Sequence, residues 1–82
     1  MPRSTLRKSL RSREHRHLVE VLTSSRHLAG LTQHDLAARL KRARSFVGRI
    51  EAGERRVDVI EFIAIAAAME VDPKQLFARL VG

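Results

Sequence analysis

The stretch LTQHDLAARLKRARSFVGRIEAG, residues 31–53, decides the fold of this chain. It predicts two short amphipathic helices joined by a tight turn, because apolar side chains recur there at helical spacing and can share one buried face. These side chains are Leu36, Leu40, Val47 and Ile50. Arg42, Arg44 and Arg49 are interleaved with them and cannot all point inward. A compact helix pair with cations on its outer face suits the major groove of a DNA duplex.

Size and composition indicate one small domain with a single core. The chain has 82 residues, of which 44% are hydrophobic, and it contains no cysteine, which excludes disulfides and thiolate metal sites. No apolar run approaches the roughly 20 residues that a membrane span needs. No secretory signal follows the basic N-terminus. We therefore expect a soluble cytoplasmic protein, associated with the nucleoid, that needs no cofactor.

The net charge of +7 is concentrated in two regions. Residues 1–13 carry five basic side chains and no acidic one, and residues 41–56 carry six basic against two acidic ones, whereas residues 57–82 are slightly acidic. This asymmetry favours a polyanionic partner that faces the basic patch. Since residues 1–13 hold little apolar surface to bury, they are expected to form a disordered basic arm before a domain that spans 14–82.

Helix boundaries are marked by recognisable capping residues. Gly30 is expected to end the first helix in a left-handed conformation. Thr32 with Asp35, and Asp58 with Glu61, have the spacing of capping boxes that begin helices. No strand-like alternation appears, so the fold class is all-α with five helices. The expected helices span about 14–29, 32–40, 43–52, 59–69 and 73–80.

Four segments, in their order and spacing, resemble the lambda-repressor-like (Xre/Cro-type) helix-turn-helix DNA-binding family: AGLTQ (29–33), LAARL (36–40), SFVGRIEAGERR (45–56) and VIEFIAIAAAMEVDP (59–73). The resemblance covers about residues 17–80. It implies a compact five-helix domain and a sequence-specific transcriptional regulator, in the style of a bacterial or phage repressor. Double-stranded DNA is then the expected partner, with helix 43–52 entering the major groove.

The resemblance also implies which residues read the bases. The positions that face base edges in the family are occupied here by Arg44, Ser45, Gly48 and Arg49. Because the arginine fork can bond O6 and N7 of guanine, we expect guanines opposite Arg44 and Arg49. The alternative that either arginine reaches only a phosphate stays open.

Other polar residues of this region suit contacts with the DNA backbone. The amide of Gln33 and the free N–H groups of its helix N-terminus can bind a phosphate oxygen, and His34 lies beside them. Arg42, Arg55 and Arg56 are expected to anchor phosphates without reading sequence. For these three arginines the alternative is a solvated loop.

One acidic residue and three departures from the family pattern need a separate account. In the family the position of Glu51 pairs with an arginine of the first helix, and Arg26 occupies the matching place, so this pair is expected to be structural. Lys41 stands where glycine is usual and must take a positive φ or alter the turn. Gly48 stands where serine is common, and helix 43–52 lacks a clear polar cap.

Dimerisation is expected, because one helix-turn-helix reads about one half-site. Leu76, Phe77 and Leu80 are expected to face inward from the last helix. The helix before it is more apolar than one inner face requires, so we expect a self-association patch. Its predicted members are Val57, Val59, Ile60, Ile63 and Phe77. The alternative that all of these complete the monomer core stays open.

One rival interpretation stays open, and two others are disfavoured. A small protein of this fold can act as an antitoxin or adaptor whose main role is to bind a partner protein, such as a toxin or co-regulator, with autoregulatory DNA binding. A metal site is disfavoured, because the spacing of the histidines, at 15, 17, 27 and 34, matches no pair of ligands with a nearby acid. No clustered nucleophile, base or glycine-rich loop supports an enzyme.

Overall fold

The computed structural model describes residues 12–81, and this part of the chain consists of five α-helices and no strands. The predicted all-α class with five helices is therefore confirmed. The helices are α2 (Arg13–Leu28), α3 (Gln33–Leu40), α4 (Arg44–Glu51), α5 (Val59–Ala68) and α6 (Pro73–Val81). Arg13, which we assigned to the arm, is the first residue of α2, and residues 1–11 of the predicted arm lie outside the described part.

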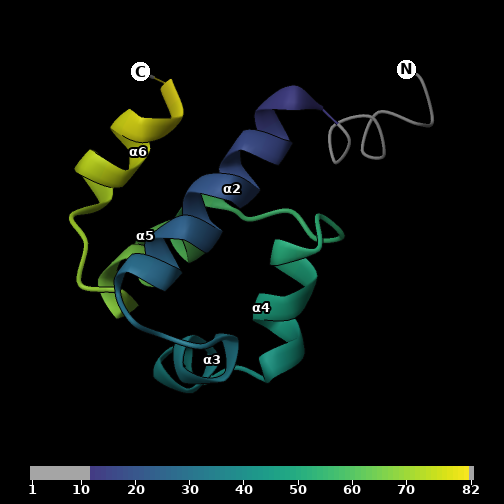
Figure 1. Ribbon diagram of the computed structural model, residues 1–82, viewed down its shortest axis with the longest axis vertical. Coiled ribbons are helices and arrows are strands. Elements are labelled where there is room, and N and C mark those ends of the chain that lie inside the picture. Colours follow the sequence, from purple (N-terminus) through teal and green to yellow (C-terminus); the bar gives the residue numbers. More distant parts are fainter. Residues whose placement is uncertain (1–11, 82) are drawn as a thin grey trace.

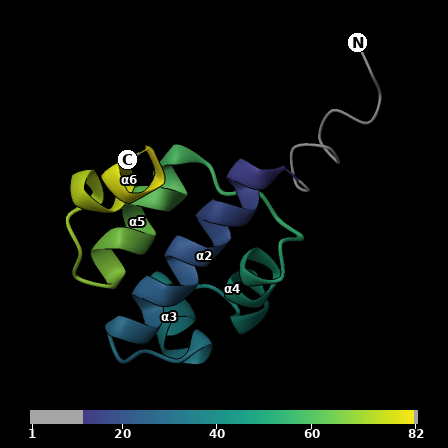
Figure 2. The ribbon, with the colours of Figure 1, turned by 45° about the horizontal axis from the view of Figure 1, so that its top comes forward.

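Helix α2 runs through the middle of the domain (Figure 1). It packs on α4 and α6, while α3 packs on α4 and α5, and α5 on α6. In the views of Figures 1 and 2, α4 and α6 lie on opposite sides of α2. The arginine-rich helix α4 and the C-terminal helix α6 are thus separated by α2. Within residues 12–81, no helix has both the length and the apolar character to cross a membrane.

The predicted capping boxes fix the starts of α3 and α5. The backbone N–H of Asp35 donates to Thr32 Oγ1 at 3.0 Å, and that of Thr32 donates to Asp35 Oδ2 at 2.9 Å. The same exchange joins Asp58 and Glu61, at 2.7 and 3.1 Å. Each box satisfies two N–H groups that the first turn of a helix otherwise leaves unpaired.

The core draws on all five described helices. Its fully packed members are Val21, Leu22, Leu31, Leu36, Ala37, Phe46, Val47, Ile50, Ile65, Ala66, Met69 and Leu76. Leu40 and Leu80 are half-buried against this cluster. The prediction that Phe77 faces inward is wrong, because its side chain is 54% exposed. Its ring makes a T-shaped contact with the ring of Phe62, with the ring centres 6.2 Å apart.

The turn between α3 and α4 uses a left-handed lysine. Lys41 has φ 56° and ψ 41°, so it takes the positive φ that we gave as one of two outcomes. The N–H of Arg42 then reaches back to the carbonyl of Ala37 at 3.0 Å, which closes the helix end as a glycine commonly does. A side chain in this conformation costs roughly 1 kcal/mol relative to glycine.

Candidate nucleic-acid interface

Helix α4 has one buried face and one open face. Phe46, Val47 and Ile50 are packed into the core. At 3.6 residues per turn, the predicted base-reading residues occupy the opposite side: Arg44, Ser45, Gly48 and Arg49. Gly48 is half-buried and the other three are exposed. The N-cap, Ala43, makes no side-chain hydrogen bond, so the first turn of α4 lacks the polar cap that we also found missing in the sequence.

Beneath this open face, Arg26 of α2 and Glu51 of α4 form a buried ion pair. Arg26 Nε donates to Glu51 Oε2 at 2.7 Å, and Nη2 donates to Oε1 at 2.8 Å. Both side chains are only 8% exposed. Arg26 Nη1 also donates to the carbonyl of Leu31 at 2.8 Å. The guanidinium therefore ties together α2, α4 and the loop before α3.

Gln33, the first residue of α3, completes this arrangement. Its Nε2 donates to Glu51 Oε1 at 2.9 Å. Burial raises the pKa of the Glu51 carboxyl, but the hydrogen bonds from Arg26 and Gln33 outweigh burial and hold that pKa below its usual value. One of the two amide hydrogens that we expected to meet a phosphate is thus used inside the protein.

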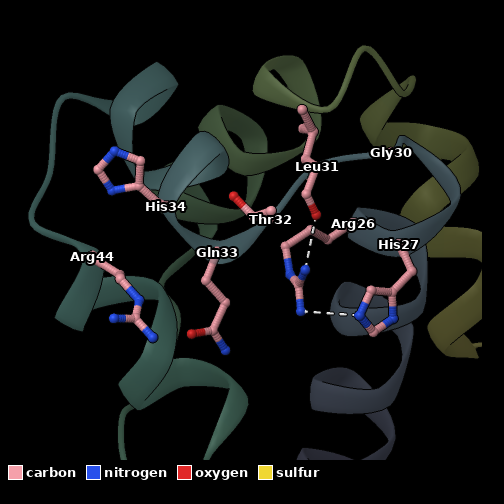
Figure 3. Close-up of a pocket in the computed structure, with 8 residues that line it drawn as sticks. All are labelled: Arg26, His27, Gly30, Leu31, Thr32, Gln33, His34 and Arg44. Atoms are coloured by element: carbon pink, nitrogen blue, oxygen red, sulfur yellow. Dashed lines mark hydrogen bonds between the residues drawn. The ribbon is translucent and has the colours of Figure 1, made fainter.

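The surface between α3 and α4 is hollowed on both sides of Gln33. A wide depression of about 700 Å³ runs from the end of α2 to the start of α4 (Figure 3), and its lining includes Arg26, His27, Gln33, His34 and Arg44. A smaller hollow of about 270 Å³ is lined by Gln33, Arg44, Ser45 and Gly48. Cationic side chains and the N-terminus of α3 thus border a depression that is open to solvent.

Arg55, which we expected to anchor a phosphate, also makes several contacts within the protein. Its guanidinium makes a bidentate pair with Glu61 at 2.8 and 2.7 Å, donates to the carbonyl of Arg56, and lies 4.6 Å from the centre of the Phe46 ring. The pair with Arg55 lowers the pKa of Glu61 to about 2. Sequence reasoning assigned Glu61 only to the capping box and so missed this second role.

The remaining predicted backbone contacts are exposed. His34, Arg42 and Arg56 all lie on the surface. The guanidinium carbon of Arg42 sits 4.0 Å from the centre of the Phe46 ring, which restrains the arginine without covering it. These three side chains therefore remain accessible to a phosphate, whereas Arg55 is committed to Glu61.

The predicted self-association residues lie mostly on the surface of α5 and α6. Val59 is 73% and Ile60 74% exposed, and Ile63 and Phe77 are about half-exposed. Val57 differs, because it is half-buried against the core. Val81, at the end of α6, is 69% exposed.

The histidines do not form a metal site in the described part of the chain. Within residues 12–81, no three side chains of the kinds that bind metals come together. His15 is buried in α2, and burial followed by the charge of Arg56 lowers its pKa. His17 contacts the Arg79 carbonyl instead.

Two short helices joined by a tight turn, with an open arginine-bearing face on the second, define a helix-turn-helix DNA-binding domain. A family model described as a helix-turn-helix domain matches residues 17–80, and the chain belongs to the Xre-type helix-turn-helix family. It is accordingly a DNA-binding protein of the class that regulates transcription.

Solved structures give the same assignment. An XRE-family like protein from Pseudomonas syringae pv. tomato str. DC3000 is 40% identical over 95% of each chain, with a TM-score of 0.82. The restriction-modification controller protein C.AhdI from Aeromonas hydrophila is 32% identical over 80% of this chain and 100% of its own, with a TM-score of 0.67. The wild-type controller C.Esp1396I is 26% identical over 85% and 90%, with a TM-score of 0.79. A comparison with curated proteins found none that matches.

Proposed function

We propose that this protein is a sequence-specific transcriptional regulator that binds, as a homodimer, to an operator with two half-sites. The observation that carries the proposal is the open face of α4, with Arg44 and Arg49 exposed above the buried Arg26–Glu51 pair. A rigid support of this kind holds the recognition helix in one orientation, which specific groove contacts require. Acting on DNA, the protein works in the cytoplasm at the nucleoid.

Base readout is assigned to Arg44, Ser45, Gly48 and Arg49. Arg44 and Arg49 are five residues apart on α4, about 140° around the helix axis, so they lie at the two edges of its open face. Each can bond O6 and N7 of a guanine, which discriminates against the other bases by about 1–3 kcal/mol. We therefore propose that each half-site contains guanines opposite these two arginines.

Backbone anchoring is assigned to the N-terminus of α3 with His34, to Arg42 and to Arg56. The first-turn N–H groups of α3 and its dipole attract a phosphate, and the exposed cations flank it. Arg55 leaves this set, because a phosphate would have to displace Glu61 from a bidentate pair at 2.7–2.8 Å. Its role is to hold the loop after α4.

Self-association is assigned to the exposed apolar side chains of α5 and α6, with Val57 removed and Val81 added. Val59, Ile60, Ile63 and Phe77 together present apolar surface to solvent, which a second copy of the chain can cover. Of the two helices that carry this surface, α6 lies on the opposite side of α2 from α4. Pairing through α6 therefore leaves both recognition helices free.

The experiment is selection of binding sites from random duplex DNA, followed by affinity measurements on the selected site and on random DNA. Arg44→Ala and Arg49→Ala should weaken the selected site by roughly tenfold or more and random DNA much less. Equal weakening of both DNAs contradicts the assignment of these arginines. Arg56→Ala should instead reduce the salt dependence of both.

The self-association assignment has its own test. Ile60→Glu places a charge in the exposed apolar surface and should give a folded monomer in sedimentation at micromolar concentration. A wild-type protein that stays monomeric with and without the selected DNA contradicts the dimer.

A role in a restriction–modification system is favoured by the controller proteins among the similar structures. A restriction and a methylation gene beside this one support that role. A toxin-like gene there supports the antitoxin alternative, in which the apolar surface binds the partner protein.

A further inference from the structure

The orientation of Gln33 carries an inference that deepens the proposed function and rests on it. We propose that Gln33 reads a base: its side-chain carbonyl oxygen, Oε1, accepts a hydrogen bond from the exocyclic amine of an adenine or a cytosine in the major groove. This replaces the expectation that the Gln33 amide binds a phosphate.

The direction of the Gln33 amide is fixed by the carboxylate beside it. An ionised carboxylate only accepts hydrogen bonds, and Glu51 Oε1 receives Gln33 Nε2 at 2.9 Å. If the amide turned over, its oxygen would face the carboxylate oxygen, and two acceptors repel. Both carboxylate oxygens of Glu51 accept hydrogen bonds from the Arg26 guanidinium, through Nε and Nη2, which holds the carboxylate in place. Nε2 must therefore face inward and Oε1 outward.

The outward oxygen lies over the recognition helix. A Cβ added to Gly48 would meet Gln33 Oε1 at 3.6 Å, as the one contact within 4 Å. Gln33 and Gly48 also line the same hollow as Arg44 and Ser45, which are assigned to base readout. In Figure 3 the side-chain amide of Gln33 lies between Arg26 and Arg44, with its oxygen on the Arg44 side. The glycine leaves this oxygen uncovered.

An acceptor in this position distinguishes bases by the chemistry of their edges. In the major groove, adenine N6 and cytosine N4 are donors, whereas guanine O6 and thymine O4 are acceptors. Gln33 Oε1 therefore favours the first two and repels the others. A phosphate oxygen is also an acceptor, so it does not fit the same place. Arg44 and Arg49 are donors that select the acceptors of guanine, whereas Gln33 Oε1 is an acceptor that selects a base with a donor.

The test uses affinities of the full chain for the selected operator and for each single base-pair change of it. Gln33→Met keeps the side-chain length, removes the acceptor, and leaves Glu51 paired with Arg26. It should reduce discrimination at one adenine- or cytosine-bearing position by about five- to tenfold and leave the other positions unchanged. Gly48→Ala should fold at least as well, since alanine favours helices more than glycine does. Because its Cβ covers one side of Oε1, it should weaken the preference at that same position.

A base analogue tests the hydrogen bond directly. Purine in place of adenine, or 2-pyrimidinone in place of cytosine, removes the exocyclic amine at that position. Wild-type protein should bind the modified operator about fivefold less well, whereas Gln33→Met should bind both operators equally.

Two outcomes overturn the inference. Equal weakening of all sequences by Gln33→Met makes Gln33 a backbone-positioning residue, and insensitivity of the wild type to the analogue removes the hydrogen bond. In both cases the loss of guanine preference in Arg44→Ala and Arg49→Ala still supports the proposed function. If those two variants keep the wild-type preference, the proposed function fails instead.

Discussion

Two arginine–glutamate pairs lie near the C-terminal end of the recognition helix, and solvent reaches them to different degrees. The inner pair, Arg26–Glu51, is 8% exposed on both sides and joins helices that are far apart in sequence. The outer pair, Arg55–Glu61, is 29% and 17% exposed and joins a loop to the start of α5. Both pairs are bidentate with similar distances, so geometry alone does not separate them.

The difference lies in what each pair would leave behind if it were broken. A buried charge that loses its partner keeps its full desolvation cost, whereas water can replace a lost partner near the surface. Removing one member of the inner pair should therefore cause a large loss of stability. Removing one member of the outer pair should cause a smaller loss of stability, which comes mainly from the hydrogen bonds of Glu61.

The largest effect is expected from Arg26→Met. It leaves Glu51 buried with only Gln33 as a donor, and it should lower the free energy of unfolding by about 3–5 kcal/mol, measured by urea denaturation. The matched control is the double variant Arg26→Met with Glu51→Leu, which removes both charges and should recover most of the loss. If the double variant is as unstable as the single one, packing and not charge explains the effect.

A smaller effect is expected from Glu61→Gln. The glutamine retains a capping side chain but loses the ionic part of the bidentate pair with Arg55, so the free energy of unfolding should fall by about 1–2 kcal/mol. Glu54→Gln, an exposed position of the same loop, serves as the control and should change stability by less than about 0.5 kcal/mol. An equal response at both positions would remove the distinction between a paired and a solvated glutamate.

The dependence of stability on acid pH gives a second test of the Arg55–Glu61 pair. The pKa of Glu61 falls from its usual 4.5 to about 2 on folding, chiefly through the hydrogen bonds from Arg55. A depressed pKa contributes stability that is fully present above about pH 4.5 and is lost as the pH falls toward 2. The difference in stability between wild type and Glu61→Gln should therefore shrink across that range in urea titrations. A difference that stays constant from pH 6 to pH 2 contradicts the assignment.

The smallest effect on stability is expected from Arg42, whose guanidinium lies against the Phe46 ring. Arg42→Ala removes a guanidinium 4.0 Å from the Phe46 ring centre, and an exposed contact of this kind contributes about 0.5–1 kcal/mol. The same variant should flatten the salt dependence of DNA binding by nearly one counterion. A stability loss as large as that of Glu61→Gln would make Arg42 part of the structural pair instead of a surface cation.

Much of the fold follows from local sequence signals. The capping boxes at Thr32 and Asp58 fix helix starts through contacts three residues apart, and such contacts can be read from spacing. The Arg26–Glu51 pair spans 25 residues and came from the family resemblance, not from any local pattern. Spacing alone would not have joined these two side chains.

The details that the sequence did not predict depend on packing between helices. Phe77 sits beside inward residues in the α6 pattern, but the way α6 meets α2 and α5 leaves its ring outside. Arg55 and Arg56 are indistinguishable as neighbouring cations, and only the position of Glu61 separates them. The hydrogen bond from Gln33 to Glu51 was not predicted, because the two residues lie on different helices and are 18 residues apart.

The double role of Glu61 bears on the spacing of the operator. Through Arg55 it holds the loop that leaves the recognition helix, and through Asp58 it starts the helix that carries the exposed apolar side chains. In a dimer formed through those side chains, the two recognition helices would be set apart by a stiff connector. Such a dimer would have a fixed distance between its recognition helices. It should therefore bind weakly to an operator lengthened by a few base pairs between its half-sites, even when every contacted base is kept.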